Sequence, residues 1–175
     1  MFRGWGLSWG GWLDNRRGEW WLMGQLLLIA AHLIPAWPST SAFGLQRWPW
    51  QLSLLGALLL SLGLLLALQA FQALGSSLSP LPEPKQDNQL VCHGPYQRCR
   101  HPMYQAVLVC SLGVALGLGS LAHLLLLFAL VLVLGGKARR EEQTLLTLHP
   151  DYISYQRGTA AIIPNVPWLD WHESC

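Results

Sequence analysis

Two short charged motifs hold most of the side chains that could do chemistry in this sequence, Arg100-His101-Pro102 and Glu141-Glu142. Pro102 is favoured as the first residue of a helix, because its missing N–H would be unpaired there in any case. That places His101 at the helix N-cap, beside free backbone N–H groups and the positive end of the helix dipole. Arg100 adds a cation that can hold a carboxylate through two hydrogen bonds. The alternative interpretation is a basic flank of a membrane span with an ordinary proline start.

The glutamate motif follows Lys137, which lies four residues before Glu141. At this spacing the two side chains could pair on a helix surface, which would occupy one glutamate. Neighbouring residues on a helix point about 100° apart, so we expect only one of Glu141 and Glu142 to face a shared pocket, and the sequence leaves open which. A pocket with Arg and His on one wall and Glu on the other suits a zwitterion.

The element that must bring the two motifs together is the uncharged stretch between Arg100 and Lys137. This stretch is too long for one membrane span and carries Gly117, Gly119 and Ser120 near its middle. We therefore expect a tight helical hairpin formed by residues 103–118 and 121–134. Because a hairpin returns its second end beside its first, the two motifs are predicted to lie close together at the same depth.

Two further apolar stretches, residues 20–37 and 50–74, precede the hairpin. A helix crosses the hydrocarbon core with about 20 apolar residues, so the fold class is predicted to be all-α, a polytopic membrane protein with about four transmembrane helices. Charged residues make up only 11% of the chain. The net charge of +2 indicates no nucleic-acid partner. We expect the first apolar stretch to be a retained span rather than a secretory signal peptide.

The distribution of basic residues predicts the orientation in the membrane. With four crossings, one side holds ten of the eleven Lys and Arg residues and the other holds only Arg47. The positive-inside rule then predicts that the richer side, which carries both motifs, is cytoplasmic. The tryptophans gather in the flanks and near the ends of the spans, as interfacial anchors do. The ten basic residues are Arg3, Arg16, Arg17, Lys85, Arg98, Arg100, Lys137, Arg139, Arg140 and Arg157.

A linker at residues 75–95, rich in Ser and Pro, divides the chain. We predict an N-terminal segment, residues 1–74, with two transmembrane helices, and a core, residues 75–175, with the linker, the hairpin and a cytoplasmic tail. The tail should form one helix at residues 137–148 and a short one at 151–157.

For His32 and His123, which lie in predicted spans, a hydrogen-bonded helix contact is favoured over a functional site. The cysteines form no zinc-type pair, and Cys92 and Cys99 are expected to be reduced, although a disulfide is possible.

The ordered set of motifs resembles a known family. The set runs from Leu90-Val91 through Gly94-Pro95-Tyr96 and Arg100-His101-Pro102-x-Tyr104 to the apolar hairpin and Glu141-Glu142. It is similar to the membrane methyltransferases related to isoprenylcysteine carboxyl methyltransferase and the phospholipid methyltransferases. The prolines Pro80, Pro82 and Pro84, the Tyr152-x-x-Tyr155 motif and Ile163-Pro164 are similar to bacterial members. Ala106 stands where the family commonly has Gly.

The resemblance implies a methyltransferase that uses S-adenosylmethionine, whose methionyl group is a zwitterion, and needs no metal. By motif position, Gly94, Pro95 and Tyr96 would line the cofactor pocket. Arg100, His101 and Tyr104 would hold the polar parts of the cofactor, and Glu141 and Glu142 would complete the pocket. The acceptor would be a lipid or a small hydrophobic molecule, and the sequence leaves open whether oxygen, nitrogen or sulfur is methylated.

Two other functions remain open at this point. One is a membrane reductase that uses NAD(P)H, because sterol reductases share a similar helical arrangement, although the sequence contains no dinucleotide fingerprint. The other is a non-catalytic membrane protein on the same scaffold. No catalytic base, oligomeric state or role for the Trp-rich N-terminus follows from the sequence.

Overall fold

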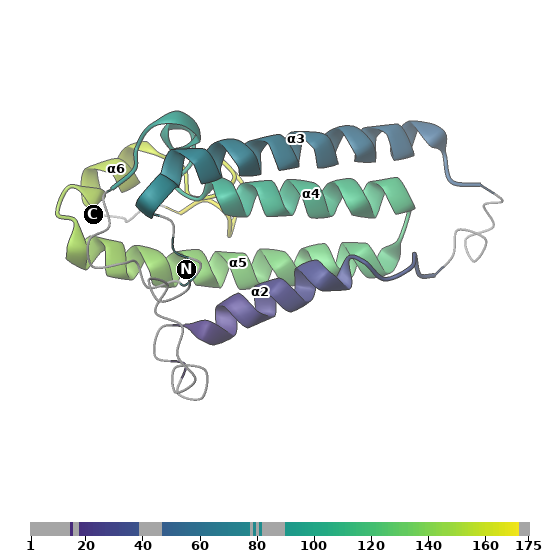
Figure 1. Cartoon of the computed structure of the whole chain (residues 1–175), viewed down its shortest axis with the longest axis horizontal. Coiled ribbons are helices and arrows are strands. Elements are labelled where there is room, and N and C mark those ends of the chain that lie inside the picture. The colour runs from purple at the N-terminus through teal and green to yellow at the C-terminus, as the bar shows by residue number, and fades with distance from the viewer. Residues whose placement is uncertain are drawn as a thin grey trace.

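The computed structural model describes residues 15, 18–38, 47–77, 79, 81 and 90–171 (Figure 1). In this described part the chain forms five α-helices and no strand, as the predicted fold class requires. The helices are α2 (Glu19–Ala31), α3 (Trp50–Leu74), α4 (Pro102–Leu118), α5 (Leu121–Leu148) and α6 (Tyr152–Gly158), with short 3-10 turns η3 (Gly75–Ser77) and η4 (Gly94–Gln97). The prolines of the linker and the Trp-rich residues 1–14 lie outside the described residues.

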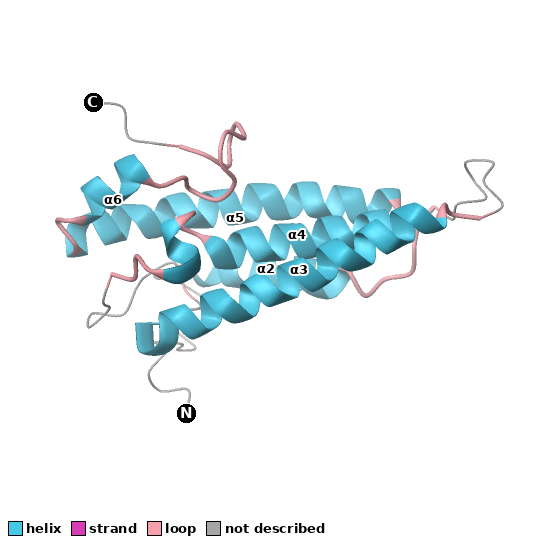
Figure 2. Ribbon diagram, turned by 90° about the horizontal axis from the view of Figure 1, so that it is seen from above, coloured by secondary structure: helices cyan, strands magenta, loops and turns pink. Residues whose placement is uncertain are grey.

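Helices α2, α3, α4 and α5 lie along one long axis, and each runs opposite to the helix that follows it (Figures 1 and 2). The start of α2, the end of α3, the start of α4 and the last turns of α5 therefore share one end of the bundle, where α6 also lies. We call this the polar end. It carries both charged motifs, so the second end of the hairpin lies beside its first end, as predicted.

Small residues let α3 and α4 approach each other at backbone distance. A Cβ atom added to Gly56 would come within 2.5 Å of the Gly113 carbonyl oxygen and the Gly117 nitrogen. One added to Gly63 would meet the Cys110 sulfur at 2.5 Å. Close backbone contact of this kind is typical of helix pairs in membranes, where side-chain burial alone supplies little driving force. The seam holds the start of α4, and with it His101, against the end of α3.

A polar cluster joins the helices at the far end of the bundle, and its members Ser111, Ser120 and His123 are buried. His32 Nε2 lies 2.6 Å from the Ser111 hydroxyl, and His123 Nδ1 lies 2.7 Å from the Ser120 hydroxyl. Ser120 also bonds the backbone of Trp37 in both directions. These contacts tie the end of α2 to the turn between α4 and α5, so His32 and His123 are helix contacts, as the favoured interpretation held.

Two predicted boundaries are wrong. The first helix ends at Ala31 rather than near residue 37, and the residues from 32 to 38 form turns and bends. The predicted separation of residues 121–134 from 137–148 is also absent, because α5 is one continuous helix of 28 residues. The glycine at position 136 does not break it, since a Cβ there would meet the Trp21 ring at 2.4 Å, and the missing side chain makes room for α2.

Two of the described helices, α3 and α5, are long and apolar enough to cross a membrane by length and composition. Helices α2 and α4 are also apolar, with 13 and 17 residues. Leucines at positions 54, 58, 62 and 65 of α3 are about half exposed and face away from the bundle. An apolar outer surface of this kind is expected where lipid rather than water surrounds a protein.

Candidate active site

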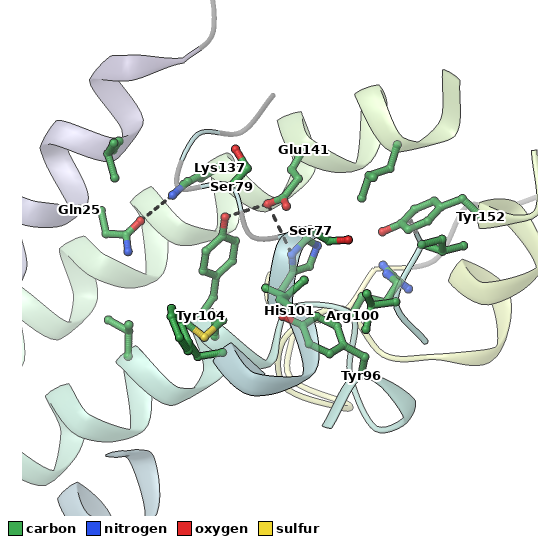
Figure 3. Close-up of a pocket in the computed structure, with 18 of the residues that line it drawn as sticks. Gln25, Ser77, Ser79, Tyr96, Arg100, His101, Tyr104, Lys137, Glu141 and Tyr152 are labelled. Carbon is green, nitrogen blue, oxygen red and sulfur yellow. Dashed lines mark hydrogen bonds and ion pairs between the residues drawn. The ribbon is translucent and has the colours of Figure 1, made fainter. Parts of the chain in front are cut away.

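A cavity of about 320 Å³ opens at the polar end, between α2, α3, α4, α5 and α6. Its polar lining includes Arg100, His101, Tyr104, Lys137 and Glu141, and Figure 3 shows these side chains converging from α4, α5 and the segment before α4. Its apolar lining comes mainly from α2, α3 and α4, with Leu22, Leu26, Phe71, Leu74, Met103 and Val107. Ligand pockets of small molecules commonly combine a largely apolar wall with a few placed polar groups.

Arg100 is buried, and all five of its N–H donors are used inside the protein. Nε and Nη2 donate to the two carboxylate oxygens of Glu142, at 2.7 and 3.3 Å. Nη1 donates to the carbonyl oxygens of Gln156 and Thr159, and Nη2 also donates to that of Trp171. The guanidinium therefore has no donor left over for a bound carboxylate in this arrangement.

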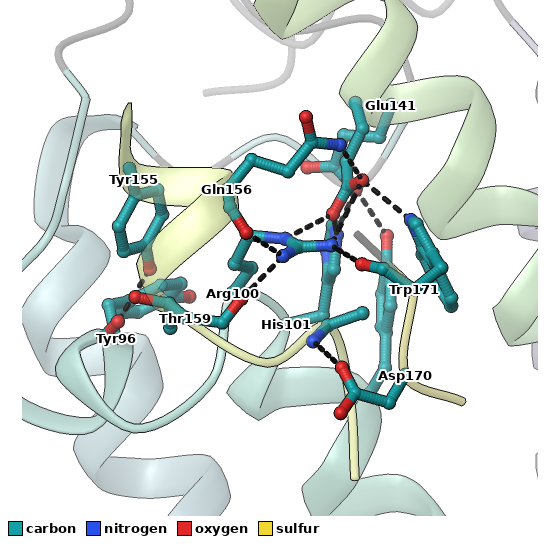
Figure 4. Close-up of polar contacts among 12 residues, drawn as sticks. Tyr96, Arg100, His101, Glu141, Tyr155, Gln156, Thr159, Asp170 and Trp171 are labelled. Atoms are coloured by element: carbon teal, nitrogen blue, oxygen red, sulfur yellow. Dashed lines mark hydrogen bonds and ion pairs between the residues drawn. The ribbon is translucent and has the colours of Figure 1, made fainter. Parts of the chain in front are cut away.

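Glu142 is the buried member of the glutamate pair. Its Oε1 accepts from Arg100 and from His101 Nε2, at 2.9 Å, and its Oε2 accepts from Arg100, Gln156 Nε2 and the Trp171 indole (Figure 4). It does not line the cavity. Glu142 lies on the charged last turns of α5, past the apolar stretch. Burial alone would raise the pKa of its carboxyl, but the hydrogen bonds and charges of His101 and Arg100 lower that pKa to about 2.

Glu141 is the glutamate that faces the cavity. Its side chain is 25% exposed, its Oε2 accepts a hydrogen bond of 2.7 Å from the Tyr104 hydroxyl, and it lies 3.8 Å from His101 Nδ1. The His101 and Tyr104 rings stack, with centroids 5.2 Å apart. His101 caps α4 and Pro102 is the first helical residue, as predicted. His101 thus bridges the buried Glu142, through Nε2, and the cavity, through its Nδ1 face.

Lys137 and Gln25 form a second polar group in the cavity that the sequence did not single out as a site. Lys137 is 2% exposed, its Nζ donates to Gln25 Oε1 at 2.8 Å, and it lies 5.2 Å from the Tyr104 ring centroid. Lys137 lies inside the bundle and not on a helix surface, which is where the sequence alternative placed its pairing with Glu141. Gln25 comes from α2, whose pattern suggested only a membrane span.

The Gly94-Pro95-Tyr96 motif forms η4, and only its tyrosine lines the cavity. Gly94 has φ +61°, a conformation that side chains rarely adopt, so its identity serves the turn. The backbone carbonyl of Tyr96 accepts a hydrogen bond of 2.5 Å from the Tyr155 hydroxyl. Of the eight residues that the resemblance placed at the pocket, Tyr96, Arg100, His101, Tyr104 and Glu141 line the cavity, whereas Gly94, Pro95 and Glu142 support it from outside.

The C-terminal segment contributes residues that no motif revealed. The Arg100 and His101 N–H groups donate to the Ala160 and Ala161 carbonyls, at 2.9 and 3.0 Å. The segment then returns so that the Trp171 indole donates to Glu142 at 2.7 Å. The Arg139 guanidinium stacks over the Trp171 ring at 4.5 Å. In the sequence Trp171, like Trp168, resembles an interfacial anchor, so its role here becomes visible only from the contact.

The fold and the site together define a helical-bundle protein with a mixed polar and apolar cavity at one end. The family model described as phospholipid methyltransferase matches residues 52–149, more than half of the chain, and the protein belongs to this family. Membership of this family implies a methyltransferase and does not by itself identify the cofactor or the methyl acceptor. The match includes both charged motifs and the hairpin, and leaves out α2, α6 and the C-terminal segment.

Two curated proteins are similar to this chain. The "Cobalt-zinc-cadmium resistance protein CzcN" of Cupriavidus metallidurans is 34% identical over 132 residues, which is 71% of this chain and 56% of that protein. The "Nickel-cobalt-cadmium resistance protein NccN" of Alcaligenes xylosoxydans xylosoxydans is 31% identical over 87 residues, which is 47% of this chain and 39% of that protein. The matched part of the chain thus spans about half of the first relative and less of the second.

Proposed function

We propose that this protein is an integral membrane S-adenosylmethionine-dependent methyltransferase that transfers a methyl group to a lipid-borne or small hydrophobic acceptor. The observation that carries the proposal is the cavity at the polar end, which combines the Glu141, His101 and Tyr104 group with an apolar wall from α2, α3 and α4. Membership of the phospholipid methyltransferase family supports it.

The chemistry of the cavity fits the cofactor. Glu141 presents a carboxylate that can hold the ammonium group of the methionyl part, and its negative charge is complementary to a sulfonium. Tyr96, His101, Tyr104 and Glu141 are the residues that would hold the cofactor. Arg100 and Glu142 would not hold the cofactor themselves. They would position His101, because Glu142 accepts hydrogen bonds from both Arg100 and the His101 ring. When bound, the cofactor supplies an electrophilic methyl group.

The task of the protein in such a reaction is to align the acceptor with the methyl carbon and to exclude water. A carboxylate acceptor needs no base, whereas an amine or a thiol must lose a proton. Glu142 is a poor proton acceptor, because five hydrogen bonds occupy its oxygens and its pKa is about 2. Among the acidic and imidazole groups of the two motifs, Glu141 and His101 face the cavity and are candidate bases.

We further propose that α2, α3, α4 and α5 all cross the membrane and that the polar end faces the cytoplasm. Helices α2 and α4 are short for a full span, so local thinning of the bilayer or burial against α3 and α5 would accompany this arrangement. The apolar wall of the cavity then lies on the membrane side of the charged groups. An acceptor dissolved in the bilayer would reach the site along this wall.

Binding measurements with the purified protein in detergent micelles test the proposal. We expect saturable binding of S-adenosylmethionine and none of NADPH, since a reductase would show the reverse pattern and a non-catalytic protein would bind neither. Glu141→Gln should weaken cofactor binding by about 10- to 100-fold, the range for losing a charge-assisted hydrogen bond, with little change in melting temperature. Glu142→Gln is the matched variant one residue away and should lower the melting temperature instead.

The acceptor can then be identified by transfer of a labelled methyl group into a total lipid extract, with mass analysis of the product. Two outcomes would contradict the assignment of Glu141 to the site. In the first, both glutamate variants bind the cofactor as well as the wild-type protein does; in the second, both lose the same amount of stability.

The names of both curated relatives refer to resistance to heavy metals. We propose that this protein methylates a component of the membrane and that this methylation contributes to such resistance. Among the described residues, no group of three or more His, Cys, Asp and Glu side chains is placed to hold a metal ion. Growth of a metal-sensitive strain in cobalt, zinc or cadmium should improve with the wild-type protein and not with Glu141→Gln. Equal protection by both would disconnect resistance from methyl transfer.

A further inference from the structure

Residues 162–169, which follow α6, form a closed loop beside α5. We call this segment the tail loop. Its two ends meet, because the N–H groups of Ile162 and Ile163 both donate to the Leu169 carbonyl, at 2.8 and 3.1 Å. In Figure 2 the chain after α6 runs back along α5, away from the polar end, before it turns toward the C-terminus. The loop contains no charged residue.

The tail loop lies level with the uncharged part of α5. The hydrophobic core beside it contains Ile162 and Leu169 of the loop. The same core contains Leu134 and Leu130 of α5. These two leucines precede Lys137, the first Lys, Arg, Asp or Glu of α5, by three and seven residues, which is roughly 5 and 10 Å along the helix axis. The loop therefore reaches past the charged last turns of α5 to the depth of its apolar stretch.

The N–H groups of the loop are satisfied almost entirely within the segment. Pro164 and Pro167 have no N–H. The Asp170 carboxylate accepts from the N–H groups of Ala161 and Asn165, at 3.1 and 2.9 Å. Carbonyls of the loop accept from the N–H groups of Ile162, Ile163, Val166, Leu169 and Asp170. Among the described residues, only the N–H of Trp168 in this run has no acceptor. Lipid offers few hydrogen-bond partners, so a segment that touches lipid must satisfy its backbone in this way.

The tip of the loop continues an exposed apolar stripe of α5. Phe128 and Leu132 are four positions apart and exposed, so they lie on one face of the helix. Gly135 and Arg139 follow on the same face at spacings of three and four. The Trp168 carbonyl oxygen accepts from Arg139 Nη2 at 3.2 Å, and a Cβ added to Gly135 would stand 3.8 Å from that oxygen. The stripe thus passes from α5 onto the loop.

Trp168 presents its ring outward from the tip. The residue is 75% exposed, and Val166 beside it is also exposed. Its φ of +74° lies in the left-handed region, which residues other than glycine rarely adopt and which the closed loop imposes here. An indole ring is favoured where a membrane meets water, because most of the ring is apolar and its N–H is polar. Water or headgroup oxygens at that level would also supply an acceptor for the Trp168 backbone N–H.

We propose that the tail loop is a re-entrant loop that inserts into the membrane leaflet at the polar end, with Val166 and Trp168 at the boundary between headgroups and acyl chains. The partner is a lipid surface, and the exposed Arg139 beside the loop is complementary to anionic headgroups. The inference rests on the membrane placement of α5 under the proposed function and not on methyl transfer. It changes the predicted topology, in which residues 162–169 belong to a cytoplasmic tail.

Fluorescence quenching in lipid nanodiscs of phosphatidylcholine and phosphatidylglycerol tests the insertion. The full-length chain, in a Cys92→Ser and Cys175→Ser background, carries an environment-sensitive dye at Val166→Cys, which keeps Trp168, or at Trp168→Cys. Both dyes should be quenched by lipids that carry a spin label near the headgroup, and less by lipids labelled near the chain end. Both should lose most of the quenching by aqueous iodide that a water-exposed position shows.

Two positions on α5 calibrate the measurement. A dye at Leu132→Cys, in the exposed apolar stripe, should be quenched by lipids labelled near the chain end. A dye at Gln143→Cys, exposed and past the charge at Lys137, should be quenched by iodide. Cys99 and Cys110 remain in every variant, so dye uptake by the background protein is measured and subtracted.

The outcomes separate the inference from the proposed function. Iodide quenching at Val166 as strong as at Gln143 would place the loop in water and overturn the inference. Protection of Val166 from iodide and from every labelled lipid would mean that protein covers the loop, a second copy of this chain included, and would overturn it as well. Where the two loop positions differ, Val166 decides, because Trp168→Cys removes the proposed anchor. If no lipid quenches the dye at Leu132, the membrane placement of α5 itself fails.

Discussion

At the scale of single residues, the two neighbouring glutamates have different tasks. Glu142 points into the protein and gathers Arg100, His101, Gln156 and Trp171 around one carboxylate. Glu141 points into the cavity and bonds only Tyr104 among the side-chain hydrogen bonds of the described residues. The expectation that one glutamate would face the pocket agrees with this arrangement. A buried pair such as Arg100 and Glu142 is costly to break, because removal of one partner leaves the other charge buried alone.

The lowered pKa of Glu142 predicts how stability depends on pH. A carboxyl whose folded pKa is below its unfolded value stabilises the fold at pH values above the unfolded pKa, and this contribution is lost as the pH falls. For Glu142 the window runs from about 4.5 down to about 2. We expect the melting temperature in detergent to fall through this window more steeply for the wild-type protein than for Glu142→Gln. Parallel curves would show that Glu142 does not carry the low pKa.

At the scale of helices, the seam between α3 and α4 depends on positions without a side chain. Gly56 faces the backbone of α4, where no atom can move aside by a rotamer change. Gly117 lies in the same seam, but a Cβ there would stand 3.9 Å from the Gly56 Cα, an ordinary contact distance. The two glycines therefore differ in the consequence of one added methyl group.

Gly56→Ala should destabilise the protein by about 1–3 kcal/mol, the usual effect of forcing an extra group into a packed interface. Gly117→Ala should be neutral or slightly stabilising, because alanine favours the helix by up to about 1 kcal/mol over glycine. Thermal or denaturant unfolding of both variants in the same detergent measures the difference. Equal effects of the two substitutions would mean that α3 and α4 are less closely packed than the structure shows.

At the scale of the whole molecule, the charge asymmetry has two origins. Arg98 lies between η4 and α4, Arg139 in the last turns of α5 and Arg157 in α6, all at the polar end, whereas Arg47 precedes the start of α3 at the opposite end. Arg100 and Lys137, however, are buried in the site. Two of the basic residues that suggested the orientation therefore belong to the site and not to the membrane flank. The orientation needs a direct test.

Cysteine labelling in intact cells tests the orientation. Cys92 is exposed at the polar end, so in a Cys175→Ser background a membrane-impermeant maleimide should label it only after the cells are permeabilised. Arg47→Cys, combined with Cys92→Ser and Cys175→Ser, should be labelled without permeabilisation. The reverse pattern would place the polar end outside the cytoplasm, and labelling of both positions from outside would contradict four crossings.

The sequence alone determined the class of the fold and the neighbourhood of the site. Uncharged apolar stretches of about 20 residues or more predict membrane-type helices, a hairpin returns its second end beside its first, and a proline is favoured at the first position of a helix. The span of α3 and the turn at Gly119 and Ser120 therefore followed from local composition. The sequence identified only some of the residues that line the cavity, and it did so through the ordered set of motifs along the chain.

The tertiary structure alone decided which atoms face the cavity. Glu141 and Glu142 are identical in type and adjacent in sequence, so only the helix rotation set by packing separates them. Lys137 resembled a surface flank, and Gln25, Gln156 and Trp171 belonged to no charged motif, because their roles depend on contacts across 14 or more positions of the chain. Such contacts form after the helices dock, and no local pattern encodes them.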